Sequence, residues 1–137
     1  MIRSLLSLVL ALHLLPVHAQ QEAHPIEQEM SRCTERNNST LGMMDCAMTA
    51  YERWDAELNA VYQELMANLP SAAADQLRDS QRHWLAFRDA EFEAIGEIYG
   101  GRDGSIWPLV MAGARLDLLQ QRVETLIEYR DMLFPDQ

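Results

Sequence analysis

The sequence has 137 residues, of which 48% are hydrophobic, and its 21 acidic and 11 basic side chains give a formal net charge of −10 at pH 7. A surface this acidic repels nucleic acid and anionic lipid, so we expect no nucleic-acid partner, and a basic partner if charge guides binding. The chain is long enough to fold around an apolar core without a metal, and we expect no cofactor.

Residues 1–19 have the pattern of a secretory signal peptide. Arg3 precedes an apolar run from Leu5 to Leu15, and the small residue Ala19 ends the segment. The run is too short to span a membrane, so we expect cleavage near Ala19 and a periplasmic or secreted mature protein. Residues 20–137 then form a single domain, with a core over about residues 26–134 and a net charge of about −11.

A short helix is predicted from about Ile26 to Arg36, before the break "NNSTLG". The mature chain has two cysteines, Cys33 and Cys46. Because export places them in an oxidising compartment, we expect one disulfide between them, which contributes about 3 kcal/mol to stability. Only His24 and His83 remain as histidines in the mature chain, so no metal site is expected.

Three longer helices follow. The second is predicted from Thr40, as a possible cap, to about Leu69, and the third from Ser71, also as a cap, to about Tyr99. The glycines of "GGRDGS" suit a left-handed C-terminal cap. The fourth helix begins near Ser105.

The fourth helix has an apolar stripe whose spacing averages about 3.5 residues, typical of a seam between antiparallel helices. Its members are Leu109, Ala112, Leu116, Leu119, Val123, Leu126 and Leu133. We therefore predict an all-α fold, a small up-and-down bundle of three long helices plus a short N-terminal helix tied by one disulfide.

Charged residues fall on the apolar faces of two helices. In "QRHWLAFRD", helical periodicity turns Arg88 inward and Asp89 outward. Asp55 lies similarly on the apolar face of the second helix. An unpartnered buried arginine is costly, so we expect a buried polar centre in which Arg88 pairs with Asp55 or, as a second choice, with Glu91.

The rival interpretation is that Asp55, Arg88 and Glu91 line a cleft that binds an anionic or polar ligand. We favour the structural interpretation, because charges between helices more often fix register than act on substrates. Trp84 and Phe87 are likewise assigned to the core.

No group of residues satisfies the geometric roles of an enzyme active site, so no catalytic residue is predicted. A triad would need His83 with Ser80 or Ser105, but His83 follows Asp79 by one helical turn and is more simply its exposed partner. Glu91 is a weak candidate for a raised carboxyl group.

The loop "GGRDGSIWP" is the candidate partner-binding segment, with Arg102, Asp103, Ser105 and Trp107 as its residues. Loops on a rigid scaffold often carry binding residues, and tryptophan is a favoured interface anchor. A plain turn, with Trp107 closing the end of the core, is the equal alternative.

Four features together resemble the lysozyme inhibitor LprI N-terminal-like domain family, over about residues 33–126. They are the cysteine pair, the two-glycine loop, and two runs of residues: Tyr51, Asp55, Leu58, Asn59 and Tyr62, then Gln81, Arg82, Trp84, Phe87, Arg88 and Asp89. The resemblance implies a small exported helical domain that inhibits lysozyme. Family members often have a second cysteine pair, whose positions correspond here to Phe92 and Ala114.

The leading hypothesis is therefore an exported inhibitor of lysozyme-type hydrolases that uses an acidic surface against a basic lysozyme and a loop to obstruct its cleft. The alternative is a periplasmic structural or adaptor module that binds another envelope protein without hydrolase inhibition.

Overall fold

The computed structural model describes residues 23–135, so the predicted signal peptide and its cleavage site lie outside the described part. Residues 23–135 form four helices and no strand: α1 (Pro25–Arg36), α2 (Thr40–Asn68), α3 (Ser71–Tyr99) and α4 (Ile106–Leu133). The all-α prediction, with three long helices after a short one, is confirmed. Over the same residues, no helix is both long and apolar enough to cross a membrane.

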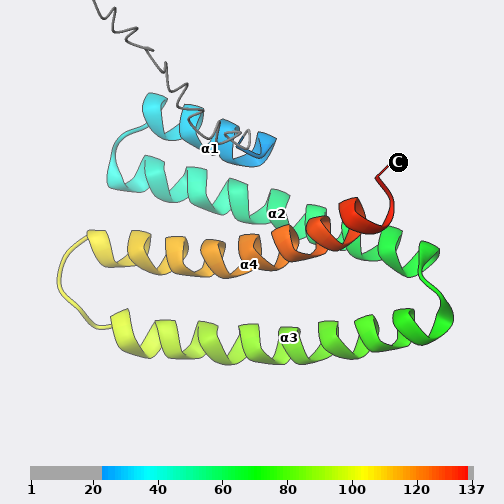
Figure 1. Cartoon of the computed structure of the whole chain (residues 1–137). Coiled ribbons are helices and arrows are strands. Elements are labelled where there is room, and N and C mark those ends of the chain that lie inside the picture. Colours follow the sequence, from blue (N-terminus) through cyan, green and yellow to red (C-terminus); the bar gives the residue numbers. More distant parts are fainter. Residues whose placement is uncertain (1–22, 136–137) are drawn as a thin grey trace, which may run out of the picture.

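The helices lie side by side in the order α1, α2, α4, α3 (Figure 1). α4 therefore lies between α2 and α3, which contact each other little. The most extensive seam joins α2 to α4, and these two helices run in the same direction (Figure 1). The expectation that the stripe of α4 marks an antiparallel seam is thus wrong, because a stripe specifies which face is buried and not the direction of the helix it meets.

The seam between α2 and α4 is the hydrophobic core. Leu65 of α2 and Leu119, Val123 and Leu126 of α4 have no measurable solvent exposure. These α4 residues belong to the predicted stripe, whereas Leu133, at the end of that stripe, is 55% exposed. The full buried cluster comprises Ile26, Ala47, Ala50, Trp54, Leu58, Val61, Leu65, Leu77, Leu116, Leu119, Val123 and Leu126.

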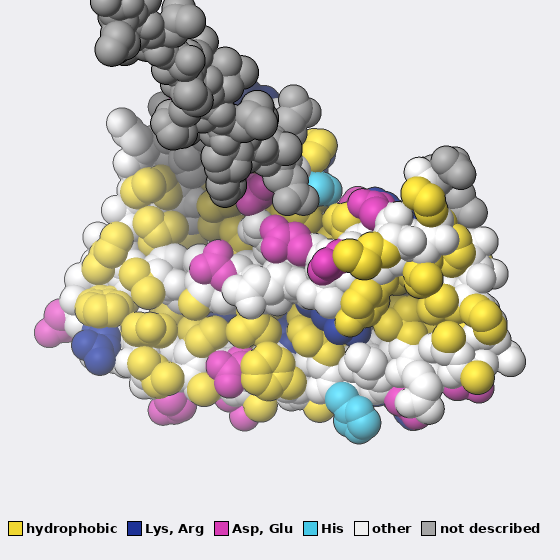
Figure 2. All heavy atoms as spheres, viewed as in Figure 1, with side chains coloured by type: hydrophobic (Ala, Val, Ile, Leu, Met, Phe, Trp, Pro, Cys, Tyr) yellow, Lys and Arg dark blue, Asp and Glu magenta, His cyan; other side chains and the backbone are white. Residues whose placement is uncertain are grey.

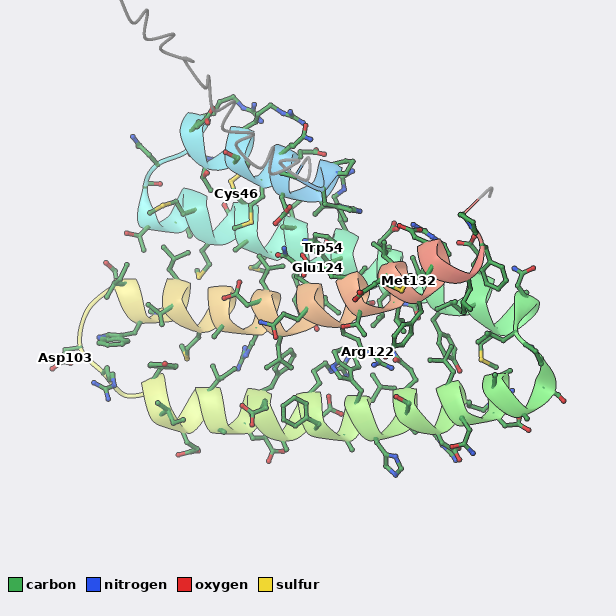
Figure 3. The ribbon with its side chains drawn as sticks, viewed as in Figure 1. Cys46, Trp54, Asp103, Arg122, Glu124 and Met132 are labelled. Atoms are coloured by element: carbon green, nitrogen blue, oxygen red, sulfur yellow. A yellow bond between two sulfur atoms is a disulfide. The ribbon has the colours of Figure 1, made fainter. Side chains whose placement is uncertain are left out.

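α1 covers the other side of α2. Trp54 is the largest fully buried side chain, and its ring lies against that of His24, with 4.3 Å between centroids. The predicted disulfide joins Cys33 of α1 to Cys46 of α2 (Figure 3). Sequence periodicity missed Trp54, since it considered only one buried face of α2, and this helix is covered on two sides.

The helix ends differ slightly from those predicted. Ser39, and not Thr40, caps α2, since its side-chain oxygen accepts a hydrogen bond from the Gly42 amide at 3.0 Å. Ser71 is the first residue of α3, which has no side-chain cap. Gly100 ends α3 in an extended conformation, and the next residue, Gly101, takes the positive φ of 73°.

α3 packs mainly on α4. Its buried residues are Ala74, Leu77, Gln81 and Ile95. Trp84 packs against the core, as predicted, but Phe87 is 52% exposed, so its assignment to the core is wrong. Trp84 and Phe87 are three positions apart on α3, and the contact with α4 is too narrow to bury both side chains.

Candidate functional site

The loop between α3 and α4, residues 100–105, lies at one end of the layer (Figure 1). Gly101 and Gly104 both have positive φ, at 73° and 112°, a conformation that favours glycine and explains the glycines of "GGRDGS". The loop thereby reverses the chain within six residues, and Arg102, Asp103 and Ser105 are exposed on it.

Trp107, in the first turn of α4, holds this loop in place. Its indole N–H donates a hydrogen bond to the Asp103 carbonyl at 3.1 Å. Its ring stacks on Tyr99, with centroids 5.8 Å apart, and the Arg102 guanidinium lies 4.8 Å from the ring centroid. Arg102 also donates to the Ile98 carbonyl, which closes α3. The four predicted loop residues are therefore brought together, with Trp107 partly buried as the support and Asp103 at the tip (Figure 3).

Apolar side chains are exposed around this end of the molecule. Ile98 and Ile106, which flank the loop, are 57% and 50% exposed, and Met48 of α2 is 55% exposed. Figure 2 shows hydrophobic side chains gathered at the end that carries the loop. Exposed aliphatic and methionine side chains beside arginine and tryptophan are typical of protein interfaces.

A groove of about 380 Å³ lies between α2 and α4, close to the loop. Its lining is mostly apolar, and the residues are Met44, Ala47, Met48, Tyr51 and Glu52 of α2 with Pro108, Met111, Ala112 and Arg115 of α4. The sequence analysis did not identify this groove. Its signal was present as two methionine positions on α2 and one on α4, but only the packing of the two helices places them together.

Arginines and aromatic rings alternate along the face between α3 and α4. From one end to the other they are Arg122, Trp84, Arg88, Phe92 and Arg115, with each guanidinium carbon 5.3 to 5.9 Å from a ring centroid. Such distances allow cation–π attraction. We refer to these five residues as the arginine–aromatic row.

The predicted polar centre is assembled differently from the expectation. The Arg88 side chain is 21% exposed and that of Asp89 is 64% exposed, so they diverge as periodicity predicts. The partner of Arg88 is nevertheless Asp89, whose Oδ1 accepts from Nε at 3.0 Å and from Nη2 at 2.7 Å. Asp55 and Glu91 are both partly exposed and, within residues 23–135, make no ion pair with Arg88. Periodicity places a Cβ atom, but a long arginine side chain can turn back to its neighbour.

The pKa of Tyr51 depends on the charged residues around Arg88. Burial raises its pKa above the ordinary value, and the nearby carboxylates of Asp55 and Asp89 act in the same direction. Arg88 and Arg115 oppose this rise. Asp55 and Arg88 therefore lie within electrostatic range of one hydroxyl group, although they are not paired with each other.

The buried polar residue of α3 is Gln81, which is 8% exposed. Its Oε1 accepts a hydrogen bond from Arg122 Nε at 3.0 Å, and Arg122 Nη2 donates to Ser80 Oγ at 3.3 Å. Burial lowers the pKa of Arg122 below its ordinary value, although the nearby Tyr129 acts to raise it. The sequence analysis did not identify Arg122 as a donor to Gln81.

The positions of the second cysteine pair expected from the resemblance are also informative. Phe92 is part of the arginine–aromatic row, and its ring lies 6.2 Å from that of Tyr51. Arg115, next to Ala114, donates a hydrogen bond to the Phe92 carbonyl at 3.4 Å. A polar and aromatic contact therefore joins α3 to α4 at the positions where the resemblance implies a second cysteine pair.

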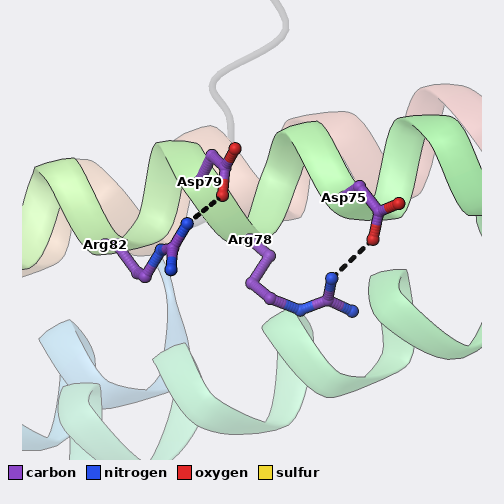
Figure 4. A network of polar contacts seen from close by, with 4 residues as sticks. All are labelled: Asp75, Arg78, Asp79 and Arg82. Atoms are coloured by element: carbon purple, nitrogen blue, oxygen red, sulfur yellow. Dashed lines mark hydrogen bonds and ion pairs between the residues drawn. The ribbon is translucent and has the colours of Figure 1, made fainter.

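The side chains considered for a catalytic triad form no hydrogen bond with one another in the described part of the chain: Asp79 pairs with Arg82, and Ser80 accepts from Arg122. Asp79 pairs with Arg82, and not with His83 as expected, and a second pair, Asp75 with Arg78, lies one turn earlier on the same exposed face of α3 (Figure 4). The long side chain and permanent charge of arginine make Arg82 the better partner for Asp79. Within residues 23–135, no three His, Cys, Asp or Glu side chains lie together in a way that could hold a metal ion.

The described residues form a small helical domain with an ordered loop and an adjoining exposed apolar surface at one end. Residues 31–126 match the family model described as Lysozyme inhibitor LprI. The chain therefore belongs to the LprI lysozyme inhibitor family, which is a family of inhibitor domains and not a known family of enzymes.

Two relatives extend the comparison. A protein of Rhizobium meliloti (strain 1021), named only as uncharacterized, is 27% identical over 126 residues, which are 82% of this chain and 84% of the relative. A crystal structure of an uncharacterized protein from Burkholderia thailandensis has a TM-score of 0.76 at 30% identity over 82% of this chain. The chain spans 56% of the length of that Burkholderia protein.

Proposed function

We propose that this protein is exported and inhibits a basic lysozyme-type cell-wall hydrolase. Membership of the LprI family supports the activity. The disulfide supports export, because such bonds persist in oxidising compartments. The protein acts by binding, so its partner is the hydrolase itself and no cofactor takes part.

The structural observation that carries the proposal is the fixed loop of residues 100–105. Trp107 holds Asp103 at its tip through the hydrogen bond to the Asp103 carbonyl, so the loop is ordered before it meets a partner. A preorganised loop loses little conformational entropy on binding. Asp103 and Ser105 offer polar atoms to the cleft of the enzyme, while Ile98 and Ile106 offer apolar contact beside it.

A second surface contributes through charge. A broad groove between the start of α1 and the end of α4 is lined by Glu27, Glu124, Glu128 and Asp131, among other residues. Its lining also includes Met132, which lies near the end of α4 opposite the loop (Figure 3). These carboxylates can attract a basic partner and accelerate its association even if they do not contact it in the complex, and salt weakens this effect.

The test is the clearing of a bacterial cell-wall suspension by a basic c-type lysozyme, with and without the oxidised mature protein, at low and moderate salt. We expect dose-dependent inhibition that weakens as salt rises. Replacing Trp107 with alanine releases the loop, and we expect it to raise the half-inhibitory concentration about tenfold or more. Asp103→Asn should also weaken inhibition.

Asp75→Asn is the matched control, since it removes one exposed carboxylate from the outer face of α3. It should leave inhibition at moderate salt unchanged. Circular dichroism shows whether each variant is folded. If the wild-type protein does not inhibit at micromolar excess, the inhibitor proposal is wrong, and an adaptor that binds another envelope protein becomes the better interpretation.

A further inference from the structure

The groove between α2 and α4 has an apolar part and a cationic end. α2 and α4 run in the same direction, so residues early in both helices lie at one end of the groove and later residues at the other (Figure 1). Met44, Met48, Pro108 and Met111 form the apolar part. Tyr51 and Glu52 come last among the lining residues of α2, and Arg115 comes last among those of α4, so these three residues mark the polar end.

Arg115 is partly buried and has few polar partners within residues 23–135. Its Nε is buried and has no hydrogen-bond partner among residues 23–135. Its single hydrogen bond, to the Phe92 carbonyl, is long at 3.4 Å, and no ion pair within the described part includes it. A buried guanidinium N–H without an acceptor costs free energy, and Arg115 Nε has none within residues 23–135 although the chain has nearly twice as many acids as bases.

A second guanidinium lies close to the same end. Arg88 and Arg115 both lie over the Phe92 ring, at 5.7 and 5.3 Å, and both act on the Tyr51 hydroxyl. Asp89 offsets the charge of Arg88 but not that of Arg115. The polar end of the groove therefore combines the Arg115 guanidinium, which has no ion pair within residues 23–135, with the Tyr51 hydroxyl and the Glu52 carboxylate. The first two are suitable partners for a carboxylate, and Glu52 opposes it.

The apolar part suits a flexible chain. Three methionines line it, and methionine side chains adapt to irregular apolar shapes. The lining of α4 extends from Pro108 to Arg115, a rise of about 10 Å, which corresponds to a medium-length acyl chain. The volume of about 380 Å³ lies in the range of small-molecule sites.

We propose that this groove binds a single-chain carboxylate amphiphile, with its acyl chain along Met44, Met48 and Met111 and its carboxylate at Arg115 and Tyr51. Glu52 also lines the groove and is exposed, so it opposes an anion and limits the affinity. The groove uses none of the loop residues 100–105, so decanoate binding can be measured separately from lysozyme inhibition.

The test is a titration of the oxidised mature protein with decanoate, followed by isothermal calorimetry and by NMR of ¹³C-methyl methionine. We expect saturable binding and shifts of the Met44, Met48 and Met111 methyl groups. Met132 is 73% exposed at the other end of α4, so it reports non-specific adsorption and should not shift. Acetate and decyltrimethylammonium should not produce the same shifts, because one lacks the chain and the other reverses the charge.

Three variants locate the head group and the chain. Arg115→Met should weaken decanoate binding about tenfold or more, because it removes a charge-assisted contact. Arg122→Met is the matched control, since Arg122 lies two turns along the same helix outside the groove lining, and it should bind decanoate as the wild type does. Glu52→Gln should strengthen binding.

Met48→Asp places a carboxylate beside the acyl chain at an exposed position, so it tests the site even if Arg115→Met fails to fold. It should abolish the shifts of Met44 and Met111. The proposal is overturned if decanoate gives no saturable binding, if decyltrimethylammonium gives the same methyl shifts, or if folded Arg115→Met binds decanoate as tightly as Arg122→Met does.

Discussion

The two sides of α4 are built by different means. Toward α2 it presents Leu116, Leu119, Val123 and Leu126, all of which are at most 3% exposed. Toward α3 it presents Arg115 and Arg122, which lie over aromatic rings and donate hydrogen bonds to α3. The first side resembles the interior of a helical bundle, whereas the second is cationic, partly exposed to solvent and held by a few directional contacts.

This difference indicates that the two seams contribute differently to stability and to the position of α3. Burial of aliphatic surface is non-directional and scales with area, so the α2–α4 seam supplies most of the stability. Hydrogen bonds and cation–π contacts contribute less but depend on geometry, so the α3–α4 seam determines where α3 lies. It also leaves Arg115 Nε without a hydrogen-bond partner within residues 23–135, and the proposed carboxylate site rests on this.

The largest effect should come from breaking the aliphatic seam. Leu119→Ala removes a side chain with no measurable exposure and leaves a cavity, so we expect it to lower the free energy of unfolding by about 2–5 kcal/mol. Urea unfolding followed by circular dichroism measures this. Leu133→Ala, at a position 55% exposed on the same helix, should change it by no more than about 0.5 kcal/mol. Equal effects at the two positions would contradict the core assignment.

An intermediate effect should come from the polar seam. Arg122→Met leaves the buried Gln81 carbonyl without its donor, so we expect a loss of about 1–3 kcal/mol in the same urea experiment. Adding Gln81→Leu removes the stranded acceptor and should restore much of that loss. A double variant whose loss equals the sum of the two single losses would show that the two side chains do not interact.

The smallest effect should come from Arg88. Its pair with the adjacent Asp89 is partly exposed, so Arg88→Met should cost no more than about 1 kcal/mol, and salt should reduce that cost. Unfolding by urea at low and high salt measures both. A cost above about 3 kcal/mol would instead favour the buried pairing with Asp55 that helical periodicity predicts.

Much of the fold was predictable from local patterns. The four helices lie within a few residues of their predicted bounds, because caps, prolines and glycines act through neighbouring backbone groups. The disulfide followed from the cysteine count and the predicted export. The exceptions, such as Trp54 and Phe87, are residues whose burial depends on how many neighbours a helix has and on how wide each contact is.

The candidate site was predictable only in part. Arg102, Asp103, Ser105 and Trp107 were identified from composition, but the hydrogen bond and stacking that make the loop rigid were not. The groove was missed because its two walls are separated by more than fifty residues of sequence. The inward direction of Arg88 was predicted correctly. Its expected partner was wrong, because side-chain torsions decide which of several carboxylates an arginine reaches.

The sequence by itself determined that this protein is helical, where its helices begin and end, and which family it belongs to, since these depend on short-range backbone chemistry and on recurring motifs. Only the tertiary structure decided that α4 lies between α2 and α3, that its arginines stack on the rings of α3, and that a groove with a cationic end opens beside α2. Those features arise from contacts between faces, and a pattern along one helix specifies its own face but not the one it meets.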